Sequence, residues 1–365
     1  MIRSTIQQMA GYTPGEQLND ADIVKLNTNE NPYPPSPRVF EAVKAALTGD
    51  KLRKYPSPTG DAFRKAAGKV LGVDPDAILI GNGSDDILTI LTRAYVPEGG
   101  LIASPTPSYV LYRSLAQIQG ARFETVPFTE DWKLPNPWPV KGAHLTFLPN
   151  PNSPSGTALR LGEVERFAAE LGGPLVLDEA YGDFCEWNGL SGNAERGTRH
   201  AESKAGASFR IPSSEFRNVI VTRSFSKYYA LAGVRFGFAV AEPATIRELN
   251  KVKDSYNCDV LSLTAATAAI EDQPYYSALR SQILATRGHM SAALSALGFH
   301  VTPSDANFVW CRRTDRPVQP IYEELKRRKI LVRYMNYAGY GDGLRISVGT
   351  NAEIEKLLKE LKAIV

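Results

Sequence analysis

Short, almost wholly apolar runs recur through the first 240 residues, and they constrain the possible folds more than any other feature. They occupy residues 77–80, 101–103, 145–148, 175–177, 219–222 and 236–240. Runs this short and apolar are typical of strands that helices cover on both faces. The helical patterns between them, such as residues 85–95 and 162–171, are suited to the crossovers of a parallel sheet. The pattern therefore predicts a large α/β domain over residues 45–255.

The pattern changes after Val260. Helical stretches are expected at residues 262–271, 275–297, 319–328 and from 351 onward, with strands at 308–311, near 330–333 and at 344–348. This order predicts a smaller α+β domain over residues 256–365. Residues 1–44, rich in Pro and Asn, are expected to form an arm that lies across both domains and contributes to the small one. Residues 188–214 mix Gly, Ser and charged residues, which predicts a surface excursion.

Charge and cysteine content exclude several classes of protein. The chain has 42 Lys and Arg against 39 Asp and Glu, a formal net charge of +3, which argues against a nucleic-acid scaffold. Three cysteines without metal-type spacing predict neither a disulfide framework nor a metal site, and they favour the cytoplasm. The sequence has no apolar stretch approaching the roughly 18 residues of a membrane span and no signal-peptide core, so we expect no membrane partner.

Polar residues follow the predicted strands at the positions where an open parallel sheet binds ligands. After the first strand, Gly83, Ser84 and Asp85 open a helix, and their free N–H groups would seat an anion. A plain turn with a helix cap is the alternative. After the strand at 175–177 comes Asp178, which is either a helix cap or a buried acid that needs a cationic partner.

The strand at 219–222 leads into Ser224, Ser226 and Lys227, with Arg235 eight residues beyond the lysine. These residues combine an amine nucleophile with a phosphate clamp, unless Lys227 is a surface lysine. The loop over residues 149–156 alternates prolines with amides and would hold an amide rigidly, or is a multiple turn. An anion seat, an amide, an acid and a lysine at one sheet edge are together what pyridoxal phosphate requires.

With these residues in view, the sequence resembles the fold-type I pyridoxal-phosphate aminotransferases (class II), and within them the histidinol-phosphate aminotransferase branch. The resemblance covers nearly the whole chain. It rests on residues 26–32, 53–56, 81–85, 107–112, 150–156, 178–181, 224–227 with Arg235, and 344–350. It implies a mostly parallel sheet covered by helices, a smaller C-terminal domain, and a homodimer with shared active sites.

The resemblance also implies roles for individual residues. Lys227 would carry the cofactor covalently and shuttle the substrate proton, and Asp178 would pair with the pyridine nitrogen. The remaining cofactor contacts would be Tyr109 on the ring face, Asn152 and Tyr181 at the phenolate, and Gly83, Ser84, Asp85, Ser224, Ser226, Arg235 and a second subunit's Tyr55 at the phosphate. Substrate would be bound by Arg345, Arg333, Tyr12 and Asn29. The alternative for Arg333 is an exposed charge that ends a strand.

One departure from the family pattern concerns the phenolate contact. Relatives commonly have Asn directly before the Pro-Thr-Gly of this loop, whereas this chain has Ser153, so the contact is assigned to Asn152. The long segment at 188–214 is a second departure.

The reaction expected is amino transfer between L-histidinol phosphate and 2-oxoglutarate, in histidine biosynthesis. The alternatives are an aromatic amino-acid aminotransferase, a phosphothreonine-type decarboxylase, and a non-catalytic module that keeps the pocket. The last is disfavoured because a mere binder needs no such lysine.

Overall fold

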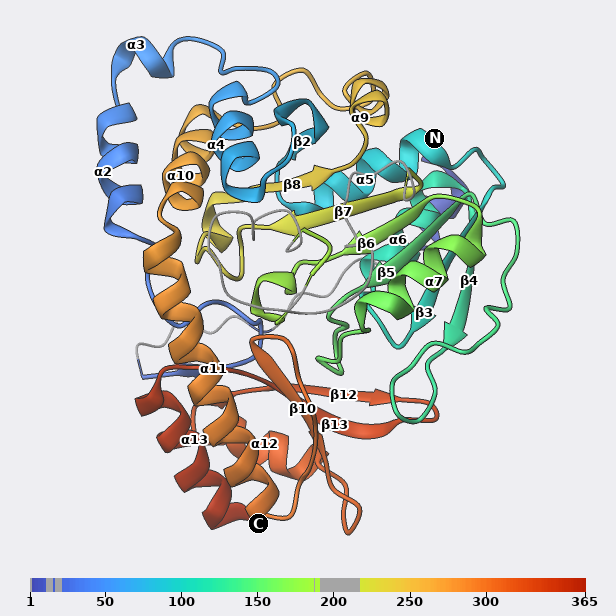
Figure 1. Ribbon diagram of the computed structural model, residues 1–365. Coiled ribbons are helices and arrows are strands. Elements are labelled where there is room, and N and C mark those ends of the chain that lie inside the picture. The colour runs from blue at the N-terminus through green and yellow to red at the C-terminus, as the bar shows by residue number, and fades with distance from the viewer. Residues whose placement is uncertain (1, 11–15, 17–21, 187, 191–216) are drawn as a thin grey trace, which may run out of the picture.

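The computed structural model describes residues 2–10, 16, 22–186, 188–190 and 217–365. Within them, the largest feature is a seven-stranded sheet in the upper half of Figure 1, with strand order β2-β8-β7-β6-β5-β3-β4. Its strands are β2 (Ile78–Gly81), β3 (Leu101–Thr106), β4 (Arg122–Pro127), β5 (Leu145–Pro149), β6 (Leu175–Asp178), β7 (Val219–Ser224) and β8 (Gly237–Val240). β8 runs antiparallel to both of its neighbours, and the other six strands point the same way.

Helices cover both faces of this sheet, which explains why its central strands are continuously apolar. In β6, Leu175 and Leu177 point to one hydrophobic cluster while Val176 points to the other. On the first face lie α4 (Asp61–Leu71), α7 (Leu161–Leu171) and α10 (Val260–Glu271). On the second face lie α5 (Ser84–Tyr95), α6 (Leu111–Gln119) and α9 (Pro243–Leu249).

A second, four-stranded antiparallel sheet lies in the lower half of Figure 1, with strand order β12-β13-β10-β9. Its strands are β9 (His300–Thr302), β10 (Phe308–Arg312), β12 (Arg333–Tyr337) and β13 (Gly341–Ser347). The helices beside it are α11 (Gln273–Ala296), α12 (Gln319–Arg327) and α13 (Asn351–Ile364). α13 begins with a capping box, in which Thr350 and Glu353 satisfy each other's backbone N–H groups. α11 extends from the region of the large sheet down along the small one (Figure 1).

The N-terminal segment joins both halves. Its strand β1 (Val24–Lys25) pairs in parallel with β11 (Ile330–Leu331), and α2 (Pro37–Ala46) packs against α10. The short helix α1 (Ser4–Gln7) packs against α6, and α3 (Gly49–Leu52) follows α2. Three 3₁₀ turns complete the described elements, at Pro75–Ala77, Gly182–Phe184 and Ala232–Val234.

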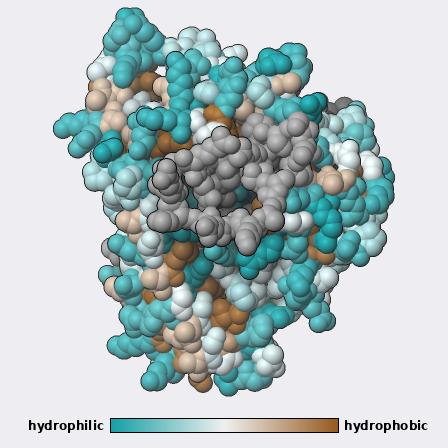
Figure 2. Space-filling view, in the orientation of Figure 1, coloured by the Kyte–Doolittle hydropathy of each residue, from teal (hydrophilic) through white to brown (hydrophobic). Residues whose placement is uncertain are grey.

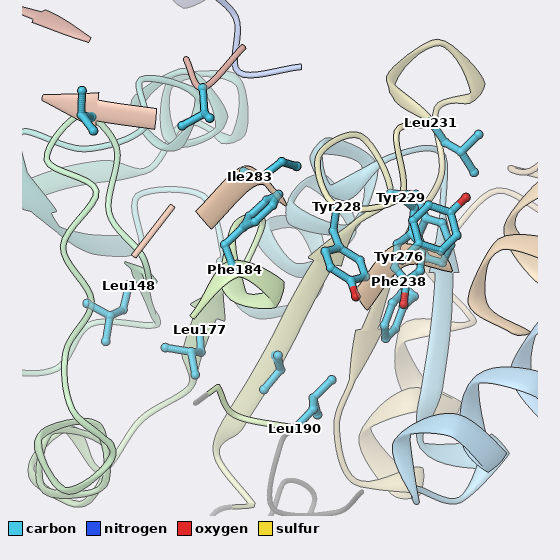
Figure 3. Close-up of a cluster of buried hydrophobic side chains, with 14 of the residues drawn as sticks. Leu148, Leu177, Phe184, Leu190, Tyr228, Tyr229, Leu231, Phe238, Tyr276 and Ile283 are labelled. Atoms are coloured by element: carbon cyan, nitrogen blue, oxygen red, sulfur yellow. The ribbon is translucent and has the colours of Figure 1, made fainter. Parts of the chain in front are cut away.

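Buried aromatic rings anchor the turn after β7. Tyr228 and Tyr229 are 7% and 5% exposed, and both contact Tyr276 of α11. Figure 3 shows these three rings together with Phe238 of β8. Phe225 stacks on Tyr229 with ring centroids 4.2 Å apart. The turn therefore has a fixed backbone although it carries no regular secondary structure.

The predicted apolar strands and the change after Val260 are present, with differences in strand direction and in the short or exposed strands, among them the two-residue β1. The run at 236–240 forms a strand, but it is antiparallel. β4 was not predicted because it is an edge strand whose residues are mostly exposed, so it lacks the continuous apolar pattern. β9 was missed because it has only three residues. Of the predicted surface excursion at 188–214, only residues 188–190 are among those described.

The outer surface carries mostly hydrophilic side chains on the face in Figure 2, as expected for amphipathic helices around buried sheets. Among the helices of the described residues, none is long and apolar enough to cross a membrane.

Candidate active site

A cavity of about 360 Å³ lies where the carboxyl ends of the parallel strands meet the small sheet. Residues that follow β2, β5, β6 and β7 line it, and β12 and β13 contribute the opposite wall. Because β8 runs the other way, its beginning lies at this same edge, which brings Arg235 into the cavity wall. Eleven of the sequence-predicted residues line the cavity: Ser84, Asp85, Tyr109, Asp178, Tyr181, Ser224, Ser226, Lys227, Arg235, Arg333 and Arg345.

Lys227 projects from the turn after β7 into this cavity. Its Nζ donates to the carbonyl oxygen of Thr28 at 2.9 Å and lies 5.9 Å from the ring centroid of Tyr181. Asn31 Nδ2 donates to the carbonyl oxygens of Lys227 and Tyr228 at 3.1 and 3.0 Å. The N-terminal segment therefore holds the Lys227 amine, and the buried tyrosines next to Lys227 in the chain fix its backbone.

A positively polarised cradle forms where α5 begins. Gly83 has φ of +83°, and a Cβ there would lie 2.6 Å from Nη2 of Arg235. Arg235 Nη1 donates to Ser226 Oγ at 3.2 Å, and its Nη2 lies 3.6 Å from Asp85 Oδ2. A glycine is favoured here because this φ lies in a region of backbone conformation that L side chains rarely adopt. Helix N–H groups, two hydroxyls and an arginine together suit a phosphate.

Asp178 ends β6 and is 5% exposed. Its Oδ2 accepts a hydrogen bond from Tyr112 Oη at 2.7 Å, and its Oδ1 accepts from Thr222 Oγ1 at 3.3 Å and Ala180 N at 3.2 Å. Burial raises the pKa of Asp178, and the hydrogen bond from Tyr112 opposes that rise. A buried carboxylate at a cavity wall is costly unless a cation pairs with it.

The N-terminal segment bonds to groups on both sides of the cavity through Asn29. Asn29 Nδ2 donates to Tyr181 Oη at 2.9 Å. Its backbone N–H donates to Ser347 Oγ, its Oδ1 accepts from the same hydroxyl, and its carbonyl accepts from Asn307. Asn29 is itself 1% exposed and is not among the residues that line the cavity. The structure therefore places it behind Tyr181, as a bridge between the two sheets.

Two arginines lie side by side on the small-sheet wall. Arg333 of β12 and Arg345 of β13 are direct cross-strand partners, and both line the cavity. Arg345 donates to Ser153 Oγ and to the carbonyl of Asn27, each at 2.9 Å, and its guanidinium lies 5.4 Å from the Phe308 ring centroid. Like charges directly opposite each other are unfavourable in a sheet, so this pair is suited to an anion between them.

Two further predicted residues, Asn152 and Tyr55, are not among the residues that line the cavity. Asn152 is 1% exposed and is not among the cavity-lining residues; its Nδ2 donates to Pro107 O at 3.2 Å and Ser155 Oγ at 3.0 Å. The residue of that loop that lines the cavity beside Pro151 is Ser153. Tyr55 is 80% exposed and stacks on Tyr256, outside the cavity of its own chain. Tyr12 lies outside the described residues.

Comparison with known proteins places this site in a family. The family model described as "Aminotransferase class I and II" matches residues 21–361. The chain belongs to this family. It is 47% identical over 356 residues to histidinol-phosphate aminotransferase of Rhodopirellula baltica, covering 97% of this chain and 92% of the relative. It is 44% identical over 364 residues to the enzyme of that name from Syntrophotalea carbinolica, covering 100% and 99%.

Solved structures agree with the family assignment. Histidinol-phosphate aminotransferase from Sinorhizobium meliloti, in complex with pyridoxal-5'-phosphate, matches with a TM-score of 0.82 and 25% identity over 99% of this chain and 98% of that one. A Thermus thermophilus aspartate aminotransferase variant matches with a TM-score of 0.77 at 19% identity, covering 100% and 99%, which shows the fold. The expected fold class and aminotransferase activity are therefore confirmed.

Sequence reasoning missed several groups that this aminotransferase brings to its site. Tyr112 is the last residue of the family pattern at 107–112, and the sequence predicts no role for it; its ring lies against that of Tyr109, which precedes α6. Thr222 could have been noticed as the polar residue of an apolar strand. The carbonyl of Thr28 carries no sequence signal, because any residue supplies a carbonyl.

Proposed function

We propose that this chain transfers the amino group between L-histidinol phosphate and 2-oxoglutarate, with pyridoxal phosphate as cofactor, in histidine biosynthesis. The main support for this proposal is that Arg333 and Arg345 are cross-strand partners and line the same cavity as Lys227. The names of relatives that are 44–47% identical over nearly the full chain support the same substrate.

The cavity residues fit pyridoxal phosphate. The Gly83 turn, where a Cβ would meet Arg235, would receive the phosphate with Ser84, Ser224 and Ser226. Asp178 would pair with the pyridine nitrogen, and Tyr109 would lie against the ring. When bound, the cofactor supplies an electron sink that makes the substrate's Cα proton acidic.

The chain's own groups then orient the substrate and move its proton. Lys227 is the cavity's amine, and we assign its Nζ as the base that takes the proton from Cα and returns it. Tyr181, whose hydroxyl accepts a hydrogen bond from Asn29 at 2.9 Å, and Ser153 would contact the phenolate oxygen of the cofactor. Ser153 also accepts a hydrogen bond from Arg345 and so orients its guanidinium group. We assign that contact to Ser153 in place of Asn152, because Ser153 is the residue that lines the cavity.

The arginine pair accounts for two substrates of different shape. A guanidinium fork matches a carboxylate or a phosphate, so Arg345 would bind glutamate's α-carboxylate in one half-reaction and the phosphate of histidinol phosphate in the other. A phosphate has close to two negative charges and three acceptor oxygens, so it can also use Arg333.

We further propose a homodimer with shared sites. Tyr55, Leu47, Leu52 and Phe40 are more than half exposed, and Tyr256 is 47% exposed beside Tyr55. Four of these exposed side chains lie within residues 40–55 of the chain, which favours a partner surface there, and a two-fold dimer is the commonest way to cover it. In this dimer Tyr55 would reach the phosphate cradle of the other subunit.

The test of the substrate assignment is Arg333→Ala. We expect kcat/KM for histidinol phosphate to fall about ten- to a hundredfold, because a charge-assisted contact is lost, while the glutamate half-reaction changes much less. Arg327→Ala, which removes an exposed arginine of α12, is the matched control and should change neither. Equal losses in both half-reactions for Arg333→Ala would show that Arg333 is structural.

A further inference from the structure

Tyr112 lies at the wall of the cavity, at the start of α6, and is completely buried. Its ring stacks on Phe147 of β5 with centroids 4.6 Å apart and planes 8° apart. The edge of Tyr109 packs against it at 5.6 Å and 86°. One ring from β5 and one from the residues before α6 therefore restrict the direction of its hydroxyl group.

That hydroxyl makes the shortest described hydrogen bond to Asp178. Tyr112 Oη donates to Asp178 Oδ2 at 2.7 Å, whereas Thr222 Oγ1 and the N–H of Ala180 reach Oδ1 at 3.3 and 3.2 Å. A bond of 2.7 Å from a phenol to a carboxylate is in the range of strong, charge-assisted hydrogen bonds. Oδ2 also keeps lone-pair capacity, because a carboxylate oxygen can accept two hydrogen bonds.

The donor and acceptor roles in this pair are fixed. Burial, followed by the charge of Asp178, raises the pKa of Tyr112 well above its ordinary value, so the phenol keeps its proton and donates. Asp85 and Tyr109 are the other ionisable groups that act on Tyr112 from α5 and the residues before α6. A donor aimed at Oδ2 stabilises the carboxylate of Asp178 over the carboxylic acid.

We propose that Tyr112 is a positioning residue that holds Asp178 as an oriented anion and so strengthens its bond to a protonated ring nitrogen of the cofactor. This inference rests on the proposed cofactor. The role of Tyr112 then depends on the ring nitrogen of the cofactor. A tyrosine that only filled the core would show no such dependence.

The test compares pyridoxal phosphate with 1-deazapyridoxal phosphate, in which a carbon atom replaces the ring nitrogen. The dissociation constants of both are measured by equilibrium dialysis with the full chain after removal of its cofactor. The wild type should bind pyridoxal phosphate more tightly than the deaza analogue. In Tyr112→Phe this preference should fall about tenfold, because the hydroxyl that holds Asp178 is gone while the ring stack remains.

Thr222→Val is the matched control, since it removes the longer hydrogen bond from the other oxygen of Asp178. We expect it to lower the preference by about threefold or less. Equal weakening of both ligands by Tyr112→Phe, or an unchanged preference, would overturn the proposal. If Tyr112→Phe does not fold, Phe147→Leu is the second variant, because it removes the ring on which Tyr112 stacks and keeps the Tyr112 hydroxyl. The preference for pyridoxal phosphate should again fall in Phe147→Leu. An unchanged preference in that variant would contradict the positioning role of Tyr112.

The outcome also separates this inference from the proposed function. A wild type that binds pyridoxal phosphate, absorbs visible light and transfers amino groups, but shows no preference over the deaza analogue, would refute the role of Tyr112 alone. A wild type that gains no visible absorbance with pyridoxal phosphate would refute the proposed cofactor.

Discussion

Among single residues, Ser153 lines the cavity whereas its neighbour Asn152 is 1% exposed and does not. Asp178 and Ser224 end two parallel strands and Lys227 comes three residues after the second, so chain order alone brings them to one edge of the sheet. Asn152 and Ser153 could not be told apart in this way. Which of the two faces the cavity depends on the turn of the 149–156 loop and on Arg345, almost 200 residues away in the chain. Long-range contacts of this kind leave no local pattern.

The two neighbours should therefore respond differently to substitution. Ser153→Ala removes the hydroxyl that accepts from Arg345 at 2.9 Å, so KM for both substrates should rise about tenfold with a smaller change in kcat. Asn152→Ala removes buried donors to Pro107 and Ser155, so it should lower the free energy of unfolding by about 1–3 kcal/mol and affect KM less. Steady-state kinetics and chemical denaturation test this, and the reverse pattern would restore Asn152 as the cavity residue.

At the scale of elements, burial decided which strands could be predicted. β5, β6 and β7 are wholly buried, and each contains an apolar run of at least two residues that made it recognisable in the sequence. β4 at the sheet edge, β1 with two residues and β9 with three give no such signal. The reversed direction of β8 was equally hidden, since an apolar strand reads the same in either direction. This reversal matters because it places Arg235 at the ligand-binding edge.

The end of β7 depends on a buried charge cluster. Arg223 is 3% exposed; it donates to Glu179 Oε2 at 2.9 Å and Asn188 Oδ1 at 2.6 Å, and it also pairs with Asp183. Arg223→Met should lower the free energy of unfolding by about 3–5 kcal/mol, because Glu179 and Asp183 would lose their buried counter-ion.

Denaturation by urea, with the apparent melting temperature as a second readout, measures this loss. Arg217→Met is the matched control, since Arg217 lies just before β7, is 69% exposed at its side chain and pairs with Glu242 at 3.3 Å; it should cost no more than about 1 kcal/mol. A cost for Arg223→Met as small as that of the control would show that the buried cluster contributes no net stability.

At the scale of the whole molecule, the site joins the large sheet, the small sheet and the N-terminal segment. Thr28 accepts from Lys227, Asn27 accepts from Arg345, and Asn29 contacts both Tyr181 and Ser347. The sequence predicted that the N-terminal residues lie across both domains, but it gave no reason for these contacts. The domain boundaries at residues 44 and 255 stay predictions. Helix α10, which begins just after the second boundary, packs on α2 and on α4 of the predicted large domain.

A shared dimeric site predicts complementation between inactive subunits. Lys227→Ala should abolish turnover, and a Tyr55 variant should be impaired if Tyr55 completes the partner's phosphate cradle. Mixed dimers of the two would contain one intact site, so activity should reappear on mixing. The pair Lys227→Ala and Arg235→Ala is the control, because both residues line the cavity of the same chain and no intact site can form. Failure of rescue in dimers shown to be mixed would count against a shared site.

The arginine pair should make this enzyme select a phosphorylated amino donor. The most direct measurement is kcat/KM of the wild type, with 2-oxoglutarate as acceptor, for L-histidinol phosphate, L-histidinol and L-phenylalanine. Because two guanidinium groups can bind the phosphate, histidinol phosphate should exceed histidinol by about a hundredfold or more, and it should also exceed phenylalanine. A preference for phenylalanine, or release of carbon dioxide without consumption of the keto acid, would show that the enzyme is not a histidinol-phosphate aminotransferase.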